Sequence, residues 1–196
     1  MPSDLLERWL EEIVAAPGAT ALRDQRTARR VLLDDALRAV PLLADLEGRI
    51  VDVGSGGGSP GIPLAVDLRE RSFTLLEAER RKCAFLDRFA RELPNVEVVW
   101  GRAEQQEPAS FGVALAKALA KPPVAAELCL PLVATGGAVI LWLGRDADRK
   151  ALTRAAERVG GSLEHDVDGL VVLRKVAETP PGYPRRPGMA KKRPLA

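Results

Sequence analysis

Apolar residues near the start of the chain recur every three or four positions, which is the spacing of an amphipathic helix. One such stretch runs from about residue 5 to residue 13 and ends before Pro17. A second runs from about residue 27 to residue 46, and Pro41 within it predicts a kink. The pattern therefore predicts a segment of short helices, residues 1–47, that packs on the rest of the protein.

Beyond residue 48, short apolar runs alternate with helical stretches. The apolar runs predict strands at residues 50–53, 73–77, 96–100, 113–115 and 138–143. The helical stretches begin at about residue 60 and continue at 80–93, 122–133 and 148–159. Two final runs, 162–167 and 170–174, flank the turn Asp168-Gly169 and predict an antiparallel hairpin. Strands that alternate with helices are typical of a parallel, doubly wound sheet, so we expect the α/β class.

Composition narrows the kind of protein and its surroundings. With 46% hydrophobic and 29% charged residues, the chain can bury one sizeable core and is not a disordered protein. Its net charge is +2, so nucleic-acid binding would have to come from local patches. Cys83, Cys129 and the single His165 cannot build a disulfide framework or a conventional metal site. We find no secretory signal and no spanning apolar run, so we expect a cytoplasmic protein without metal or membrane contact.

The most informative segment is the glycine-rich loop Asp52-Val53-Gly54-Ser55-Gly56-Gly57-Gly58-Ser59-Pro60-Gly61. It directly follows an apolar run and opens a helix, and its glycines let the backbone approach a ligand that a Cβ would exclude. Three kinds of site fit parts of this string. The remaining alternative is a tight strand-to-helix turn without a ligand, but four glycines in five positions exceed what a turn requires.

A dinucleotide site is the first interpretation. Gly56, Gly58 and Gly61 satisfy the pattern G-x-G-x-x-G, in which a helix N-terminus binds pyrophosphate. The first glycine should lie close to the strand end, whereas Gly56 is displaced from it. This interpretation also leaves Asp52 and Gly54 unexplained.

A serine hydrolase is the second interpretation. Ser59 lies in a G-x-S-x-G pattern, and His165 with Asp146 or Asp148 would complete a triad in the order Ser, Asp, His. The residue after the nucleophile must donate its backbone N–H to the oxyanion, and here that residue is Pro60, which has none. Ser59 also lies too far from the predicted strand for a sharp elbow.

A methyltransferase is the third interpretation, and it uses every unusual residue. Asp52, Gly54, Gly56 and Gly58 form the pattern D-x-G-x-G-x-G, and Glu77 ends the next predicted strand. In a methyltransferase sheet the glycine turn passes the amino-acid end of S-adenosylmethionine, and the second carboxylate accepts hydrogen bonds from both ribose hydroxyls. No phosphate has to be bound, so the helix can begin with a proline.

Several segments, in the same order along the chain, resemble the RsmG (GidB) family of bacterial 16S ribosomal RNA guanine-N7 methyltransferases. They are the loop 52–65 with its Pro-Gly-Ile-Pro ending, Leu76-Glu77 followed by Arg81-Lys82-Cys83-Ala84-Phe85-Leu86, Arg102-Ala103-Glu104, the helix segment 127–133, Leu173-Arg174-Lys175 and the ending 183–188. The resemblance runs from about residue 30 to residue 195. It is more specific than any single motif because the segments are collinear.

The resemblance implies a Rossmann-like class I methyltransferase fold, with a mostly parallel seven-stranded sheet, an antiparallel C-terminal strand and short N-terminal helices. Residues 48–176 would form the S-adenosylmethionine-binding domain and 177–196 a basic, Pro-rich tail. The implied activity is methyl transfer to N7 of a guanine in 16S rRNA or the small ribosomal subunit, by a monomer. The implied cofactor residues are Asp52, Gly54, Ser55, Gly56, Gly58, Ser59, Glu77, Ala103, Glu104 and Lys117. No residue is assigned to proton transfer, because the N7 lone pair attacks without losing a proton.

Basic residues gather in the C-terminal tail, which has no acidic residue after Pro180. We expect them to contact RNA phosphates, the alternative being a solvated, flexible tail. They are Arg185, Arg186, Lys191, Lys192 and Arg193. Trp142, next to the predicted carboxyl edge of the sheet, is either a base-stacking residue or a core residue.

Some positions depart from the family pattern. Lys117 stands where the family usually has arginine, Ser59 replaces an aromatic or bulky residue, and Gly112 and Leu143 replace an acidic residue and a lysine. The N-terminal pattern His-x-x-Asp-Ser is replaced in residues 31–35. These departures support an alternative function, a non-catalytic paralogue that binds RNA or the ribosome.

Overall fold

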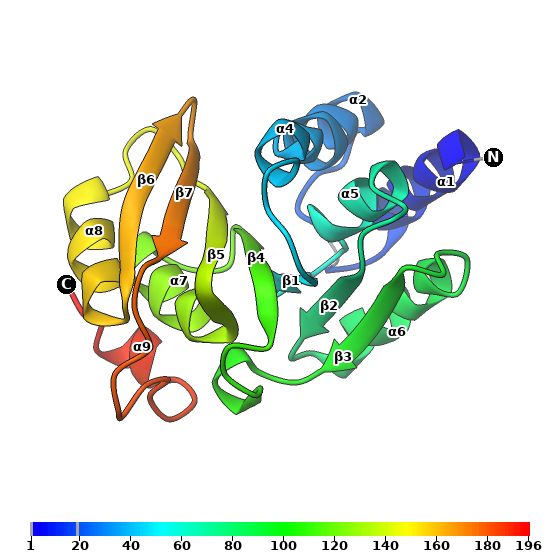
Figure 1. Cartoon of the computed structure of the whole chain (residues 1–196). Coiled ribbons are helices and arrows are strands. Elements are labelled where there is room, and N and C mark those ends of the chain that lie inside the picture. The colour runs from blue at the N-terminus through cyan, green and yellow to red at the C-terminus, as the bar shows by residue number, and fades with distance from the viewer. Residues whose placement is uncertain (1, 19) are drawn as a thin grey trace.

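The computed structural model describes residues 2–18 and 20–196. Over these residues seven strands form one sheet in the order β3-β2-β1-β4-β5-β7-β6 (Figure 1). They are β1 (Ile50–Val53), β2 (Phe73–Glu77), β3 (Val96–Trp100), β4 (Phe111–Lys117), β5 (Val133–Trp142), β6 (Gly161–Val167) and β7 (Leu170–Lys175). Neighbouring strands are parallel from β3 to β5, whereas β7 is antiparallel to β5 and β6. The predicted fold, mostly parallel with an antiparallel C-terminal strand, is confirmed.

Helices cover both faces of the sheet, because its central strands are buried on both sides, as parallel strands usually are. The helices are α1 (Pro2–Ala15), α5 (Gly61–Asp67), α6 (Arg80–Ala90), α7 (Pro122–Cys129) and α8 (Arg149–Arg158). Val51 packs in the cluster formed with α7 and α8, whereas its neighbour Ile50 packs on the opposite face with α5. With both faces covered, the ends of the strands are the part of the sheet that a ligand can reach.

The second N-terminal helix is where the prediction was wrong, because residues 27–46 do not form one continuous helix. The structure has α2 (Gln25–Ala28), a π-helical turn η1 (Arg29–Asp34), α3 (Asp35–Leu37) and α4 (Val40–Leu43). Pro41 has no N–H with which to continue the helical hydrogen bonds. In addition, side chains from outside the segment donate to the carbonyl oxygens of Val31, Leu32 and Asp35. Tertiary contacts therefore replace part of the regular helical ladder.

Smaller differences have local causes. The predicted helix 122–133 ends at Cys129 and continues as a short 3₁₀ turn, η3 (Leu130–Leu132), which contains Pro131. β5 accordingly begins at Val133 rather than near residue 138. The C-terminal hairpin is confirmed, and both residues of its turn, Asp168 and Gly169, have positive φ, as a type I′ turn requires.

The C-terminal segment, residues 177–196, packs on the domain. Its short helix α9 (Met189–Lys192) contacts α7, and Ala190 and Leu195 are buried. The segment predicted as a basic, Pro-rich tail therefore contains a turn of helix and a packed end. Within the described ranges, we find no helix that combines the length and the apolar character needed to span a bilayer.

Candidate active site

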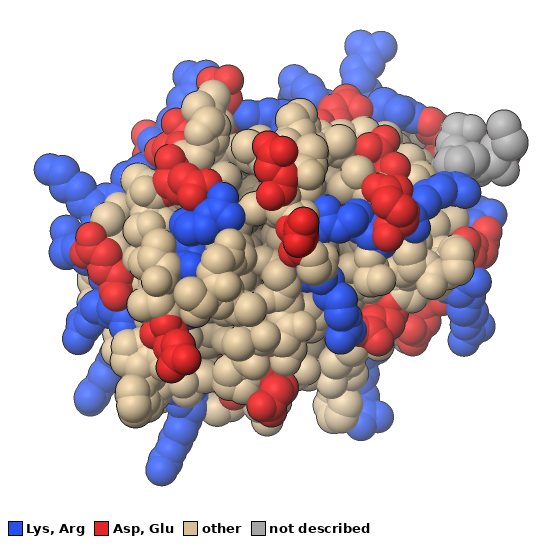
Figure 2. All heavy atoms as spheres, viewed as in Figure 1, with Lys and Arg blue, Asp and Glu red and all other residues tan. Residues whose placement is uncertain are grey.

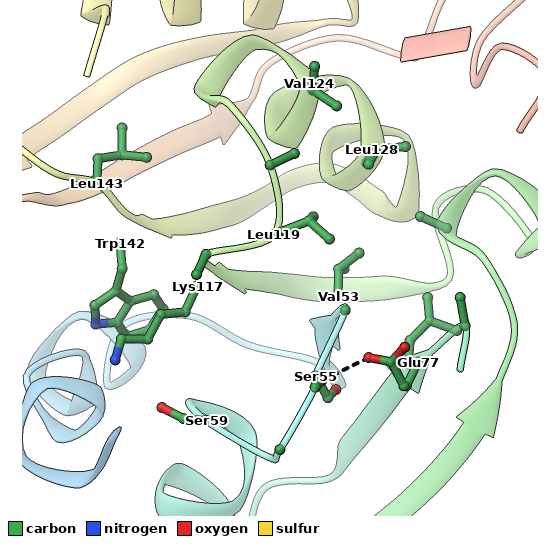
Figure 3. A pocket seen from close by; sticks show the side chains of 18 of the residues that line it. Val53, Ser55, Ser59, Glu77, Lys117, Leu119, Val124, Leu128, Trp142 and Leu143 are labelled. Atoms are coloured by element: carbon green, nitrogen blue, oxygen red, sulfur yellow. Dashed lines mark hydrogen bonds between the residues drawn. The ribbon is translucent and has the colours of Figure 1, made fainter. Parts of the chain in front are cut away.

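A cavity of about 930 Å³ opens where the carboxyl ends of β1, β2, β4 and β5 meet (Figure 3). β1 lies between β2 and β4, and the order of strands along the sheet reverses direction at this point. Open α/β sheets bind ligands at such a topological switch point. The volume is at the upper end of the range of about 300–1,000 Å³ for small-molecule pockets. There is room for a cofactor and part of an acceptor.

The glycine loop forms one wall of this cavity. The N–H groups of Gly54 and Ser55 donate to the carbonyl oxygen of Leu76 at 2.8 and 3.1 Å, so the loop continues the pairing of β1 with β2. Gly56 has φ +57°, and a Cβ built on it would meet only the Gly54 carbonyl oxygen at 3.8 Å. Gly58 has φ +105°, but a Cβ there would lie 2.5 Å from Ile62. Gly56 therefore faces open space in the cavity, whereas Gly58 is required for packing.

Trp9, on α1, supports the glycine loop from behind. From the sequence, this residue was expected only to lie on an amphipathic helix. Its side chain is completely buried, and its indole N–H donates to the carbonyl oxygen of Gly57 at 2.8 Å. A buried tryptophan usually finds a partner for its N–H, which is a signal that some polar group lies nearby. The sequence did not show that this group is the glycine loop.

Glu77 lies at the end of β2 and points toward the glycine loop (Figure 3). The residue is only 6% exposed; one carboxylate oxygen accepts the N–H of Gly56 and the other the N–H of Glu79, both at 2.8 Å. An ionised carboxylate can accept about four hydrogen bonds, so acceptor positions remain free. The side chain can hold the loop and still bind a ligand hydroxyl.

Asp52 is placed behind the loop and does not line the cavity. It is 1% exposed; one carboxylate oxygen accepts the N–H of Gly61 at 3.1 Å, and the other has no partner among the described residues. Burial raises the pKa of Asp52 to about 7. Asp52 therefore holds the first residue of α5 and does not face the cavity. Gly58 also lies outside the cavity lining. All other predicted cofactor residues line it.

The raised pKa of Asp52 predicts a pH dependence of stability. The folded state keeps this proton up to about pH 7, whereas the unfolded chain releases it near pH 4. The contribution of Asp52 to the free energy of unfolding therefore falls as pH rises from 4 to 7. The difference in free energy of unfolding between Asp52→Asn and wild type should therefore shift in favour of the variant by roughly 2–3 kcal/mol from pH 5 to pH 8, as measured by urea unfolding. The exposed Asp67→Asn should show no such trend, and a flat difference for Asp52→Asn would contradict the prediction.

The opposite wall comes from the N-terminal segment. The Ser59 hydroxyl donates to the carbonyl oxygen of Leu32 at 2.7 Å, and the Trp142 indole N–H donates to the carbonyl oxygen of Asp35 at 2.9 Å. Trp142 is half-buried and lines the cavity beside Lys117 (Figure 3). Its indole thus forms part of the cavity wall and also packs against the hydrophobic core.

Lys117, at the end of β4, is held by the same segment. Its ammonium donates to the carbonyl oxygen of Val31 and lies 3.1 Å from the Asp35 carboxylate, which also pairs with Arg38. The Lys117 side chain is 11% exposed. It lines the cavity, and its contacts with Val31 and Asp35 fix the N-terminal segment to the sheet.

The structure excludes the serine hydrolase alternative. His165 is exposed on β6, and β6 lies four inter-strand spacings from β1, or about 19 Å. Ser59 follows β1 and its hydroxyl is used by Leu32. These residues cannot form a triad.

Packing explains why position 112 is a glycine, and this could not be seen from the sequence. A Cβ built on it would lie 2.0 Å from the carbonyl oxygen of Glu47, so a larger residue does not fit. Gly112 does not line the cavity, whereas Leu143 does. The glycine at position 112 is therefore no sign of a lost active site.

Ala103 and Glu104 lie on the short turn η2 (Ala103–Gln105) at the side of the cavity next to β2 and β3. Ala103 is buried. One carboxylate oxygen of Glu104 accepts the N–H of Gly188 at 3.0 Å. The C-terminal segment therefore reaches the cavity, which the sequence did not indicate.

The basic residues of the C-terminal segment differ in their environments. Arg185 forms a bidentate ion pair with Glu127, with both nitrogen–oxygen distances 2.5 Å, so its guanidinium already has a partner within the chain. Arg186, Lys191, Lys192 and Arg193 are exposed. On the face shown in Figure 2, basic and acidic side chains are interspersed rather than collected in one patch.

Metal ligands and reactive thiols are not evident in the described part of the chain. It contains no group of three or more His, Cys, Asp or Glu side chains that could hold a metal ion. Cys83 and Cys129 are both buried, and burial raises the pKa of each thiol.

Comparison with solved structures bears on the fold. The geranyl diphosphate C-methyltransferase from Streptomyces coelicolor A3(2), solved with Mg²⁺, geranyl diphosphate and S-adenosyl-L-homocysteine, matches with a TM-score of 0.58 at 14% identity. The match covers 73% of this chain and 78% of that one. At this identity the likeness concerns the fold alone, and it agrees with the predicted methyltransferase fold.

Comparison with sequences bears on the family. The family model GidB, rRNA small subunit methyltransferase G, matches residues 4–165. A ribosomal RNA small subunit methyltransferase G from Synechococcus sp. (strain JA-2-3B'a(2-13)) is 38% identical over 187 residues, covering 82% of this chain and 72% of the relative. One from Moorella thermoacetica is 34% identical over 196 residues, covering 90% and 82%. The chain therefore belongs to the GidB family of rRNA small subunit methyltransferases G.

Proposed function

We propose that this protein transfers a methyl group from S-adenosylmethionine to N7 of a guanine in 16S rRNA, in the cytoplasm and as a monomer. Membership of the family supports the reaction class. The observation that carries the cofactor assignment is the pairing of Gly56, whose missing side chain leaves the cavity open, with the Glu77 carboxylate at the neighbouring strand end.

The residues present fit this cofactor. Backbone groups of residues 54–56 would bind its amino-acid end, since no side chain at Gly56 blocks their approach. Glu77 would accept hydrogen bonds from the ribose hydroxyls through its free acceptor positions. Ala103 and Glu104 would lie against the adenine. When bound, S-adenosylmethionine supplies an activated methyl group.

The other half of the cavity would hold the guanine, in a single-stranded or extruded form. Methylation at N7 removes no proton and leaves positive charge on the base, so the chain must orient the base and exclude water rather than supply a general base. The Asp35 carboxylate lies beside Lys117 at this wall, which reduces the repulsion between the ammonium and that charge. Trp142 provides a rigid apolar surface against which the base can be placed.

Contacts to RNA outside the cavity would come from the exposed basic residues of the C-terminal segment, Arg186, Lys191, Lys192 and Arg193. Lys191 lines the rim of the cavity, so a phosphate next to the target base can reach it. Binding of this kind weakens steeply with salt. The substrate would be free 16S rRNA or the small subunit.

The non-catalytic alternative has less support than the enzyme. The residues that favour it are Ser59, Gly112, Lys117 and Leu143. Gly112 is explained by packing, and Ser59 and Lys117 build the cavity wall without filling it. A cavity of about 930 Å³ favours a protein that still takes a cofactor.

Labelled methyl transfer tests the proposal. Small subunits and free 16S rRNA should be taken from cells that lack this methyltransferase, so that the target is unmodified. We expect label in the rRNA and strand cleavage at one guanine after borohydride and aniline treatment, which reports N7 methylation. Salt-sensitive RNA binding with no transfer would support the non-catalytic alternative, and transfer to another atom would overturn the N7 assignment.

A further inference from the structure

The C-terminal strap, residues 180–195, is fixed to the domain by buried polar contacts. Glu127 on α7 is 1% exposed, and the guanidinium of Arg185 pairs with both of its oxygens. Arg158 on α8 donates to the carbonyl oxygen of Leu195 at 2.8 Å. Because a buried carboxylate requires a partner, the strap and α7 depend on each other.

Arg185 also closes the strap on itself. The same Nη2 group that donates to Glu127 also donates to the carbonyl oxygen of Arg193, at 2.7 Å. One guanidinium therefore holds residues 185 and 193 together, and the loop between them, with α9, projects from this base. The planar fork of an arginine presents parallel donors from two nitrogens to the carboxylate and a further donor to the carbonyl, whereas a lysine has all its donors on one nitrogen and cannot form the bidentate pair.

The tip of this loop lies on the cavity. Gly188, Ala190 and Lys191 line it, and the Gly188 N–H donates to the Glu104 carboxylate at 3.0 Å. The strap thus reaches the residues expected against the adenine and fixes one of them. Neither the family comparison nor the glycine loop implies this contact.

We propose that the C-terminal strap forms part of the cofactor site, with Arg185 as a positioning residue that acts through Gly188 on Glu104. The proposal rests on the proposed function, in which the cavity binds S-adenosylmethionine. It gives the strap two sides: an inner side that shapes the adenosine end of the cavity, and an outer side with the exposed basic residues. Loss of Arg185 frees both ends of the loop between residues 185 and 193, so that Gly188 is no longer held against Glu104.

Calorimetric titration with S-adenosylmethionine and S-adenosylhomocysteine tests it. We expect Arg185→Ala to raise the Kd of both at least 10-fold and Arg185→Lys to have an intermediate effect. The matched control is Arg154→Ala, an exposed arginine on α8, which should bind within 2-fold of wild type. If wild type binds neither compound, the proposed function fails; if wild type and Arg185→Ala bind equally, only the strap proposal fails.

A double-mutant cycle separates positioning from general destabilisation. If Arg185 acts through Glu104, Arg185→Ala should weaken binding much less in a Glu104→Ala background, which has no acceptor for the Gly188 N–H, than in wild type. Equal weakening in both backgrounds would overturn the proposed route. If Arg185→Ala fails to fold, the double variant Glu127→Gln/Arg185→Gln replaces it in the titration, because this variant buries no unpaired charge. We expect it to fold and to bind the cofactor more weakly than wild type, and wild-type affinity would contradict the proposal.

Discussion

Gly56→Val is expected to abolish S-adenosylmethionine binding while leaving the protein folded. A Cβ at Gly56 has no neighbour closer than the Gly54 carbonyl oxygen at 3.8 Å, so the new side chain enters the cavity rather than the core. It would occupy the space that the backbone leaves for the cofactor and would disturb the N–H that Glu77 holds. The positive φ of +57° adds strain of about 1–3 kcal/mol for an L-residue.

Gly136→Val is the matched control for this strain. Gly136 also has positive φ, its Cβ would meet nothing within 4 Å, and it lies away from the cavity. Circular dichroism should show that both variants fold with similarly lowered Tm. Calorimetry should show cofactor binding by Gly136→Val and none by Gly56→Val. Normal binding by Gly56→Val would place the cofactor elsewhere.

Glu77→Ala is expected to weaken cofactor binding by about 10²–10⁴-fold. Hydrogen bonds to a charged group contribute about 1.5–3 kcal/mol each, and two ribose hydroxyls would lose such an acceptor. The variant also frees the N–H groups of Gly56 and Glu79, so the loop loses its tie to β2. Both effects act on the cofactor rather than on the RNA.

The nature of the Glu77 contact can be resolved with two further comparisons. Glu77→Gln keeps one acceptor oxygen and should bind with intermediate affinity. Glu97→Ala, on neighbouring β3 and outside the cavity lining, should bind like wild type. Glu77→Ala should cost a cofactor analogue that lacks the ribose hydroxyls much less affinity than it costs S-adenosylmethionine. If both compounds lose affinity by the same factor, the ribose assignment is wrong.

The sequence determined those features that depend on neighbours along the chain. The period of apolar residues located every strand of the sheet, because a buried strand needs only a short apolar run. The glycine loop and Glu77 were found because conformational freedom and a strand-end carboxylate are local signals. Their meeting could be expected since parallel neighbouring strands end at the same edge of the sheet.

The tertiary structure alone decided which charged and polar groups meet. Lys117 contacts Val31 and Asp35, Trp9 contacts Gly57, and Arg185 contacts the buried Glu127, each pair being far apart in sequence. In the sequence, Arg185 is one of several basic residues in a Pro-rich segment, and Asp35 and Glu127 are ordinary helix residues. No periodic pattern along the sequence marks a charged residue as buried. The energetic cost of burying its charge is removed by one partner, whose position depends on how the whole chain packs.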